Sequence, residues 1–356
     1  MKVLIAAGGT GGHIYPGIAV AKELLARDSA SEVLFVGTSK GLETRIVPEN
    51  GFQLSLIHSA GLKNVGLAGK IKGLAVLPQS FVEARKILRE FAPDVVVGAG
   101  GYVSGPVLLT AHFLGFPTLV MDSNALPGFT NRRLARFVDR AALTFDDAMP
   151  FFGAKGVVTG NPVREEFFGI SERKPEKPYH LLIFGGSQGA RAINNAMMSA
   201  LPLVKQSVDS LVITHQTGEA DFETVETAYR DAEIVESDIR PYITNMVEEF
   251  DKADLIICRA GATTCAEVAA AGKASIMVPL PSAADDHQRK NAEAMQKNGA
   301  VRMILQTDLS RERLAAELTD LFASPEKLAE MSRAARQLAR PDAASATVDI
   351  IESLKK

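Results

Sequence analysis

The sequence of 356 residues has no tryptophan and only two cysteines, Cys258 and Cys265. Two thiols in so long a chain exclude the disulfide framework on which small secreted proteins depend. The first residues also lack the charged start and apolar run of a secretory signal peptide. We therefore expect the protein to work in the reducing cytoplasm.

The sequence has no excess of basic residues, because its formal net charge is −3. This charge argues against a protein that binds nucleic acid through a global positive field, and we expect no nucleic-acid partner. The stretch between Asp94 and Asp122 contains no Asp, Glu, Lys or Arg, but "GAGGYVSGP" and Pro117 interrupt it. Such interruptions fit buried strands and a helix better than a membrane span.

Short apolar runs alternate with helical patterns along the whole chain. Examples are "KVLIAA", "EVLFVG" and "DVVVGA" in the first half and "HLLIFG", "DLIICRAG" and "ASIMVPL" in the second. Runs that are apolar throughout are typical of parallel strands buried on both faces. The sequence therefore predicts an α/β fold with two Rossmann-like, doubly wound parallel sheets. The charged residues 165–180 are the expected linker, and the amphipathic residues 344–356 are expected to return to the first domain.

Three glycine-rich segments each follow an expected strand, at residues 8–12, 98–101 and 185–189. In open α/β sheets this position is the carboxyl edge, where ligands bind. Glycines there allow backbone N–H groups at a helix start to approach an anion. The three segments are therefore candidate ligand-binding loops.

The first of these loops, "GGTGGHIYPG", does not fit the dinucleotide-binding fingerprint. Counting from Gly9, the sixth position is Ile14 instead of Gly or Ala, and no acidic residue ends the next strand. The loop is no P-loop either, because the G-x-x-x-x-G-K pattern is missing. The residue after these glycines is His13, which either exchanges protons with a substrate or caps the helix.

The second half of the sequence is better suited to a nucleotide. The loop "GGSQG" can place amides and a hydroxyl on a diphosphate at the start of the next helix. Glu267 is either an acceptor for a ribose diol or a surface helix residue. Arg164, in "GNPVR", either forms a structural salt bridge or binds phosphate.

The motifs "GGTGGHIYPGIA", "GAGGYVSGP", "GNPVR", "GGSQGAR" and "CRAGATTCAEVAAAG" occur in one order and spacing. In these motifs the chain resembles the MurG family of peptidoglycan synthesis, UDP-GlcNAc:lipid I N-acetylglucosaminyltransferases of glycosyltransferase family 28. The resemblance implies a GT-B fold, in which two Rossmann-like domains face each other across a cleft. Residues 1–163, capped by a C-terminal helix at 341–356, would bind the lipid acceptor and the membrane. Residues 164–340 would bind UDP-GlcNAc.

The resemblance also implies the roles of individual residues. Gln288 would select the configuration of the sugar's C4 hydroxyl, Glu267 would bind the ribose, and the backbone at Ile243 would contact the uracil. The other residues implied for the donor are Arg164, Ser187, Gln188, Gly189, Tyr242 and Asn291. Those implied for the acceptor are Thr10, Gly11, Gly12, Tyr102, Ser104, Asn124 and Asn131.

The implied reaction is an inverting displacement, in which the C4 hydroxyl of the acceptor attacks the anomeric carbon and forms a β-1,4 linkage. It needs a base for the hydroxyl and stabilisation of the departing UDP. His13 is the first candidate for the base and Asp122 the second. No D-x-D motif occurs, so neither a tightly bound metal ion nor any other cofactor is implied.

The sequence departs from the family pattern at two places. The family usually has His-Glu-Gln-Asn where this chain has "MDSN", so Asn124 is retained while Asp122 is shorter than Glu by one methylene. Ala260 replaces a common serine, and no hydroxyl contact is expected there.

An undecaprenyl-linked acceptor implies peripheral association with the cytoplasmic face of the bacterial plasma membrane. The expected partners are lipid I, anionic inner-leaflet lipids and other wall-synthesis or division proteins. The stretch 66–89 mixes apolar and basic residues as membrane-surface segments do, although most such helices pack on their own sheet. Those residues are Leu67, Ile71, Leu74, Leu77 and Phe81 with Lys70, Lys72, Arg85 and Lys86.

Three alternatives lie near this interpretation. A related GT-B transferase would move a sugar to diacylglycerol or another lipid, although "GGYVSGP" and Gln288 favour lipid I. A catalytically silent nucleotide-sugar-binding or scaffolding protein would tolerate the altered "MDSN". A dehydrogenase or UDP-sugar epimerase would share the two halves, but the required fingerprints are missing.

Overall fold

The computed structural model describes residues 1–9, 11–39, 41–59, 67–186 and 188–355, without the side chains of residues 67–75 and 284. The chain divides into two compact units. Unit 1 consists of Met1–Val163 together with Arg340–Lys356, and unit 2 consists of Arg164–Ala339. The chain therefore passes between the units twice, and unit 2 is inserted into unit 1.

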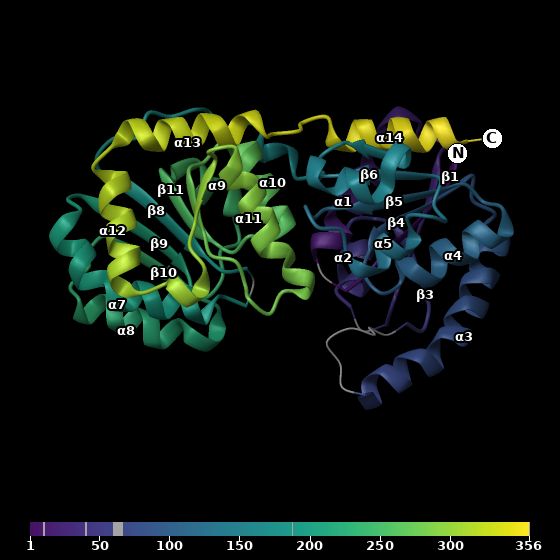
Figure 1. Cartoon of the computed structure of the whole chain (residues 1–356), viewed down its shortest axis with the longest axis horizontal. Coiled ribbons are helices and arrows are strands. Elements are labelled where there is room, and N and C mark those ends of the chain that lie inside the picture. Colours follow the sequence, from purple (N-terminus) through teal and green to yellow (C-terminus); the bar gives the residue numbers. More distant parts are fainter. Residues whose placement is uncertain (10, 40, 60–66, 187, 356) are drawn as a thin grey trace. The chain divides into compact units, whose positions relative to one another are not determined.

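Unit 1 is built on a parallel sheet of seven strands in the order β3-β2-β1-β4-β5-β6-β7. Figure 1 shows strands of this unit with helices around them. The strands are β1 (Lys2–Ala7), β2 (Glu32–Gly37), β3 (Gln53–Leu56), β4 (Val95–Gly100), β5 (Thr118–Asp122), β6 (Arg140–Leu143) and β7 (Gly156–Val158). Its helices are α1 (Gly11–Arg27), α2 (Glu43–Glu49), α3 (Leu67–Phe91), α4 (Ser104–Leu114), α5 (Phe129–Leu134), α6 (Met149–Phe152), α14 (Ala343–Leu354), and the 3-10 turns η1 (Asp146–Ala148) and η2 (Gly153–Lys155).

Helices cover both faces of this sheet. One apolar cluster joins β1 and β4 to α1 and α14, and another joins the opposite face to α3 and α4. Every residue of β4 is buried. The absence of charged side chains in this part of the sequence is explained by the position of β4 in the middle of the sheet, where both of its faces are covered. Val348, Ile350 and Ile351 of α14 belong to the first cluster, and α14 thereby completes the core of unit 1.

Unit 2 repeats this architecture with a parallel sheet of six strands in the order β10-β9-β8-β11-β12-β13. The strands are β8 (Tyr179–Phe184), β9 (Leu211–Gln216), β10 (Ser237–Arg240), β11 (Leu255–Cys258), β12 (Ser275–Met277) and β13 (Val301–Met303). The helices are α7 (Arg191–Ser207), α8 (Phe222–Asp231), α9 (Met246–Lys252), α10 (Ala262–Ala271), α11 (His287–Lys297), α12 (Arg311–Phe322), α13 (Pro325–Gln337), and the turns η3 (Glu165–Phe167), η4 (Glu219–Asp221), η5 (Ala284–Asp286) and η6 (Gln306–Asp308).

The prediction of two doubly wound parallel sheets is confirmed. In each sheet the first strand in the chain lies between the second and the fourth, so the strand order reverses between β1 and β4 and between β8 and β11. Ligands of open α/β sheets bind beyond the carboxyl ends of the strands at this reversal. The loops that follow these four strands are therefore the first place to look for a site.

None of the helices formed by the described residues combines the length and the apolar character that crossing a bilayer requires. The two cysteines are buried and free. Burial raises the pKa of both thiols, to about 12 for Cys265 and well above the usual value for Cys258. The thiols are therefore neutral parts of the core.

Candidate active site

His13 lies in the first turn of α1, where the loops after β1 and β4 meet. Its Nδ1 is 3.3 Å from the carbonyl oxygen of Gly8. A Cβ atom added to Gly100 would come within 2.4 Å of the imidazole Cδ2 of His13. A Cβ on Gly101, which has a φ of +80°, would come within 2.2 Å of the Gly8 oxygen. The glycines of "GAGGY" are therefore needed for two loops to close around the histidine.

Glu43 supports the same loop and was missed by the sequence analysis. Its carboxylate, from the start of α2, is fully buried and accepts hydrogen bonds from the Gly9 N–H at 2.9 Å and from the N–H and hydroxyl of Thr38, both at 2.8 Å. Burial raises the pKa of Glu43, but the hydrogen bonds lower this pKa by more than burial raises it, so the net shift is downward. The signal in the sequence was an acidic residue shortly after the second strand, at the start of α2, although a ribose-binding acid would end the strand itself.

Ser104, the first residue of α4, holds the loop after β4 in place through hydrogen bonds to the backbone. Its buried hydroxyl accepts from the Gly100 N–H at 3.0 Å and lies 2.9 Å from the Ala6 oxygen and 2.8 Å from the Gly100 oxygen. The side chain of Tyr102 is exposed at the same edge. Gly11 and Gly12 open α1, whereas Thr10 lies outside the described residues. Ser104 thus shapes the predicted acceptor side through the backbone.

Asp122, at the end of β5, is buried and holds the loop that follows. Its carboxylate accepts from the N–H groups of Asn124 and Gly128, each at 3.0 Å, and from Nδ2 of Asn131 at 2.8 Å. Burial raises the pKa of Asp122, and the hydrogen bonds from Asn124, Asn131 and Gly128 act against this rise. The geometry favours a positioning role for Asp122 and Asn131 and leaves His13 as the better candidate base.

In unit 2, the loop after β8 is tied to the segment after β10 by Gln216, a residue that the sequence analysis missed. The Gln216 side chain donates to the Gly186 carbonyl oxygen at 2.9 Å and accepts from the Ile243 N–H at 2.8 Å. A contact of Ile243 with a base therefore has to use its carbonyl oxygen. Gln188 and Tyr242 are exposed beside these segments, and Ser187 lies outside the described residues.

Arg164 and Glu267 lie side by side, as two of the predicted donor residues. The Nη2 atom of Arg164 is 3.8 Å from Oε1 of Glu267. The guanidinium of Arg164 also lies over the ring of Phe167, 4.8 Å from the ring centre. Burial raises the pKa of Glu267 to about 7, while Arg164 acts in the opposite direction. A carboxyl poised near neutrality and beside a cation is common at functional sites.

Gln288 and Asn291 lie on α11, which faces the end of β11. Gln288 accepts from the Leu280 N–H at 3.0 Å, and the buried Asn291 donates to the Ala260 carbonyl oxygen at 3.2 Å. Asn291 thus helps to fix the position of α11. Ala260 is buried as well.

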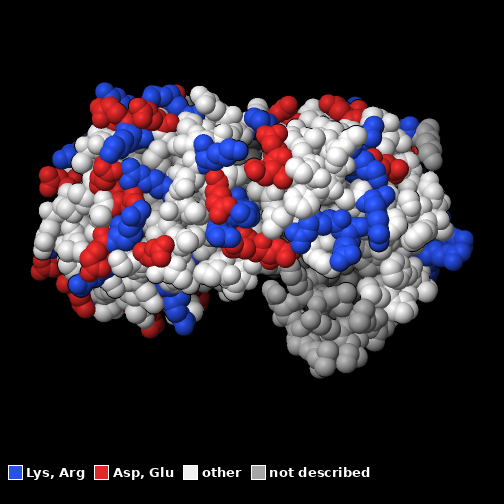
Figure 2. Space-filling model, viewed as in Figure 1, with Lys and Arg blue, Asp and Glu red and all other residues white. Residues whose placement is uncertain are grey.

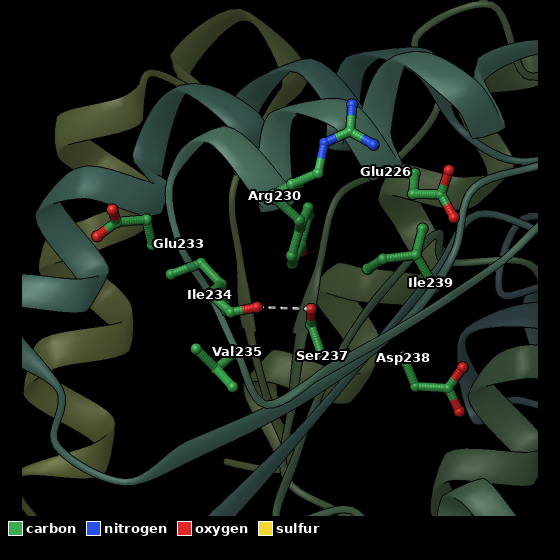
Figure 3. Close-up of a pocket in the computed structure, with 9 residues that line it drawn as sticks. Glu226, Arg230, Glu233, Ile234, Val235, Ser237, Asp238 and Ile239 are labelled. Carbon is green, nitrogen blue, oxygen red and sulfur yellow. Dashed lines mark hydrogen bonds between the residues drawn. The ribbon is translucent and has the colours of Figure 1, made fainter.

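The predicted residues that the structure describes therefore form two groups, each at the carboxyl edge of one sheet. Within the described part of the chain, no group of three or more His, Cys, Asp or Glu side chains is arranged to hold a metal ion. A pocket of about 550 Å³ lies elsewhere in unit 2, between the end of α8 and β10 (Figure 3). It is lined by Arg230, Ile234 and Val235 among others. Because it includes the amino end of β10, it lies at the opposite edge from the candidate site.

Comparison with known proteins gives matches over both units. Residues 3–143 match the N-terminal domain of glycosyltransferase family 28 and residues 180–347 match its C-terminal domain. A curated relative from Geobacter sulfurreducens is 46% identical, with 100% of each chain covered. One from Geobacter metallireducens is 44% identical, with 100% of this chain and 99% of the relative covered. Both are named UDP-N-acetylglucosamine--N-acetylmuramyl-(pentapeptide) pyrophosphoryl-undecaprenol N-acetylglucosamine transferase.

Solved structures agree with these matches. A crystal structure of MurG from Acinetobacter baumannii is 35% identical and has a TM-score of 0.82, with 99% of each chain covered. A UDP-GlcNAc 2-epimerase from Neisseria meningitidis shares the fold, with a TM-score of 0.71 at 16% identity, 99% of this chain and 100% of that chain being covered. Both family domains and full-length relatives far above chance identity match this chain, which therefore belongs to glycosyltransferase family 28 and, within it, to the family of these N-acetylglucosamine transferases.

Proposed function

We propose that this protein transfers GlcNAc from UDP-GlcNAc to the C4 hydroxyl of MurNAc in undecaprenyl-diphosphate-linked lipid I. The product is lipid II, with a β-1,4 linkage and inversion at the anomeric carbon. The observation that carries the proposal is the full-length identity of 46% to a curated transferase of this name. The same relatives favour lipid I over diacylglycerol as the acceptor.

In this reaction the imidazole of His13 takes the proton of the attacking hydroxyl. The oxygen forms its bond to the anomeric carbon while the bond from that carbon to the diphosphate oxygen breaks, and UDP leaves with the electron pair. The amides of Gly11 and Gly12 open α1 and bind the acceptor diphosphate. The Gly9 amide is not available for this purpose because Glu43 accepts its hydrogen bond.

The donor is bound by unit 2. Ser187, Gln188 and Gly189 precede α7, where backbone N–H groups and the helix dipole stabilise the charge that develops on UDP. Arg164 adds a cation beside the ribose-binding Glu267. The Ile243 carbonyl accepts from the uracil, Tyr242 flanks it, and Gln288 and Asn291 position the sugar.

The membrane contact lies on unit 1. Figure 2 shows Lys and Arg side chains gathered over α5. This helix contains Arg132 and Arg133, and the residues that follow it up to the start of β6 include Arg136 and Arg140. We define the basic-aromatic surface as Phe113, Phe129, Phe137, Arg133 and Arg136. The guanidinium of Arg133 lies 5.2 Å from the Phe129 ring, that of Arg136 lies 4.7 Å from the Phe137 ring, and Phe113 is 75% exposed. Aromatic rings with arginines suit the headgroup region of anionic lipids.

The described residues of α3 extend the same chemistry, since Arg85 and Lys86 are exposed. The side chains of Leu67, Lys70, Ile71, Lys72 and Leu74, which the sequence analysis also assigned to the membrane, lie outside the described residues.

The proposed activity is tested by mixing the protein with UDP-GlcNAc and a lipid I analogue. UDP release that depends on the acceptor, together with a disaccharide product, is expected. Absence of acceptor-dependent release would refute the proposal, and so would a preference for UDP-GalNAc over UDP-GlcNAc.

The role of His13 gives a sharper prediction. His13→Ala is expected to lower kcat by about 10²- to 10⁴-fold, the usual contribution of a general base, while UDP affinity by calorimetry stays nearly unchanged. His112→Ala, an exposed histidine of the same unit, is the matched control and should keep full turnover. A large fall in UDP affinity in His13→Ala would instead assign His13 to the donor.

A further inference from the structure

Glu43 and His13 contact opposite ends of one peptide group. The N–H of Gly9 donates to Oε2 of Glu43 at 2.9 Å. The carbonyl of Gly8, the other half of the same peptide group, lies 3.3 Å from Nδ1 of His13. A carbonyl oxygen only accepts hydrogen bonds, so Nδ1 has to carry the proton for this contact to form.

The carboxylate of Glu43 is ionised and fixed in place. It is completely buried, and its oxygens accept three hydrogen bonds, from Gly9 and from the amide and hydroxyl of Thr38. Glycines surround it because a Cβ atom at Gly37 would come within 2.5 Å of its Cγ. Each of these bonds involves a charged acceptor and is therefore stronger than a neutral one.

We propose that Glu43 is a positioning residue that acts on His13 through the Gly8–Gly9 peptide group, holding the imidazole as its Nδ1–H tautomer so that Nε2 takes the substrate's proton. A carboxylate on the N–H side polarises the peptide and makes its carbonyl oxygen a better acceptor. In Asp–His pairs the carboxylate contacts Nδ1–H directly. Here one peptide group lies between them.

The charged groups of the helices that pack near α1 pair with other residues. Arg45 and Glu49 of α2 pair with each other at the surface. Asp349 and Glu352 of α14 pair with Arg27, at the far end of α1. The connection after β4 contributes Tyr102 as its titratable group. Of the charged side chains named here, Glu43 is the one with a hydrogen bond to the Gly8–Gly9 peptide.

Glu43→Gln tests the inference, which rests on the proposed function. The side-chain amide of the glutamine has one oxygen, whereas the carboxylate accepts through both of its oxygens. In either orientation the NH2 group therefore faces a backbone N–H, of Gly9 or of Thr38, and one hydrogen bond is lost. We expect kcat/KM for the lipid I analogue to fall by about tenfold. We also expect the acid limb of the pH–rate profile to move to lower pH, because the charge that favours the imidazolium is lost. The KM for UDP-GlcNAc should stay unchanged.

Thr38→Val is the matched control, because it removes one donor to the same carboxylate while the Gly9 contact is retained. It should lose stability but keep the wild-type pH profile. In the His13→Ala background, Glu43→Gln should have no further effect on turnover. An unchanged acid limb in Glu43→Gln, or an additive effect in the double variant, would overturn the inference.

A second measurement uses the unaltered chain. The ¹⁵N shifts of the His13 imidazole, assigned by their loss in His13→Gln, should report a protonated Nδ1; a protonated Nε2 in the neutral ring would overturn the inference. Inactive wild-type protein on the lipid I analogue would refute the proposed function itself. An active wild type whose profile is insensitive to Glu43→Gln would refute the inference alone.

Discussion

The carboxyl of Glu267 is divided between its charged and neutral forms at neutral pH, because burial raises its pKa to about 7 against the opposite effect of Arg164. The ionised form accepts stronger hydrogen bonds from ribose hydroxyls. The folded protein, however, holds the proton more tightly than the unfolded chain, in which the pKa of this carboxyl is the ordinary 4.5. The free energy of unfolding therefore falls as the pH rises from about 4.5 to about 7.

Glu267→Gln should separate these two effects. At pH 8 the variant is expected to have a higher Tm than the wild type, because it no longer buries a charge. It should also bind UDP more weakly and lose the pH dependence of UDP affinity between pH 6 and 8. Calorimetric titrations and thermal scans at the two pH values measure both. A lower Tm at pH 8 would show that the Arg164 pair outweighs the cost of burial.

At the scale of elements, the geometry of the proposed donor site depends on the strands that hold its loops in place. Gln216, the last residue of β9, joins the Gly186 loop to the Ile243 segment. Gln216→Met removes both hydrogen bonds and leaves the Ile243 N–H buried without a partner, which costs about 1–3 kcal/mol. The KM for UDP-GlcNAc is expected to rise by about tenfold or more.

Thr214→Val is the control for this substitution. Thr214 lies on the same strand, and its hydroxyl contacts Glu249 at 3.3 Å instead of a ligand loop. The KM of Thr214→Val for UDP-GlcNAc, measured by steady-state kinetics, should equal that of the wild type. Equal KM values for Gln216→Met and the wild type would mean that the two loops hold their positions independently.

The elements show what the sequence could and could not predict. Apolar runs such as "VVVGA" predicted the parallel strands, and strand-then-glycine patterns predicted the loops at the ligand edge. The sequence could not reveal that Glu43 reaches Gly9 across 34 positions, or that Asp122 is enclosed by its own loop. Such contacts depend on how segments far apart in the chain pack, which periodicity does not record. For the same reason the occupied Ile243 amide was not foreseen.

At the scale of the whole molecule, the two units differ in how charge is distributed on the face shown in Figure 2. On the face that Figure 2 shows, acidic and basic side chains alternate over unit 2, whereas basic side chains gather over α5 of unit 1. Charge reversal of Arg133 and Arg136 to Glu should weaken sedimentation with vesicles containing anionic lipid, by roughly 1 kcal/mol for each charge. Lys205→Glu with Arg230→Glu, on α7 and α8 of unit 2, is the matched control. Equal losses in both pairs would exclude the basic-aromatic surface as the contact.

The last helix gives a whole-molecule test of stability. Ile351 is completely buried in the cluster of β1 and α1, so Ile351→Ala should lower the free energy of unfolding of unit 1 by about 2–5 kcal/mol. Hydrogen exchange should rise in peptides of β1 and α1 and stay unchanged in β8 and α7. Glu352→Ala, on the exposed side of the same helix, should cost much less. Uniform acceleration over both units would mean that they unfold together.

The insertion of unit 2 into unit 1 also sets an order of events during synthesis. The strands of unit 1 are translated before unit 2, whereas α14, whose Asp349 accepts a hydrogen bond from Arg27 of α1 at 2.6 Å, is translated after it. Unit 2 is continuous and has all its residues available earlier. Until α14 is made, the apolar side chains that pack against Val348, Ile350 and Ile351 stay exposed, and exposed apolar surface of this kind makes a partly folded chain prone to aggregation.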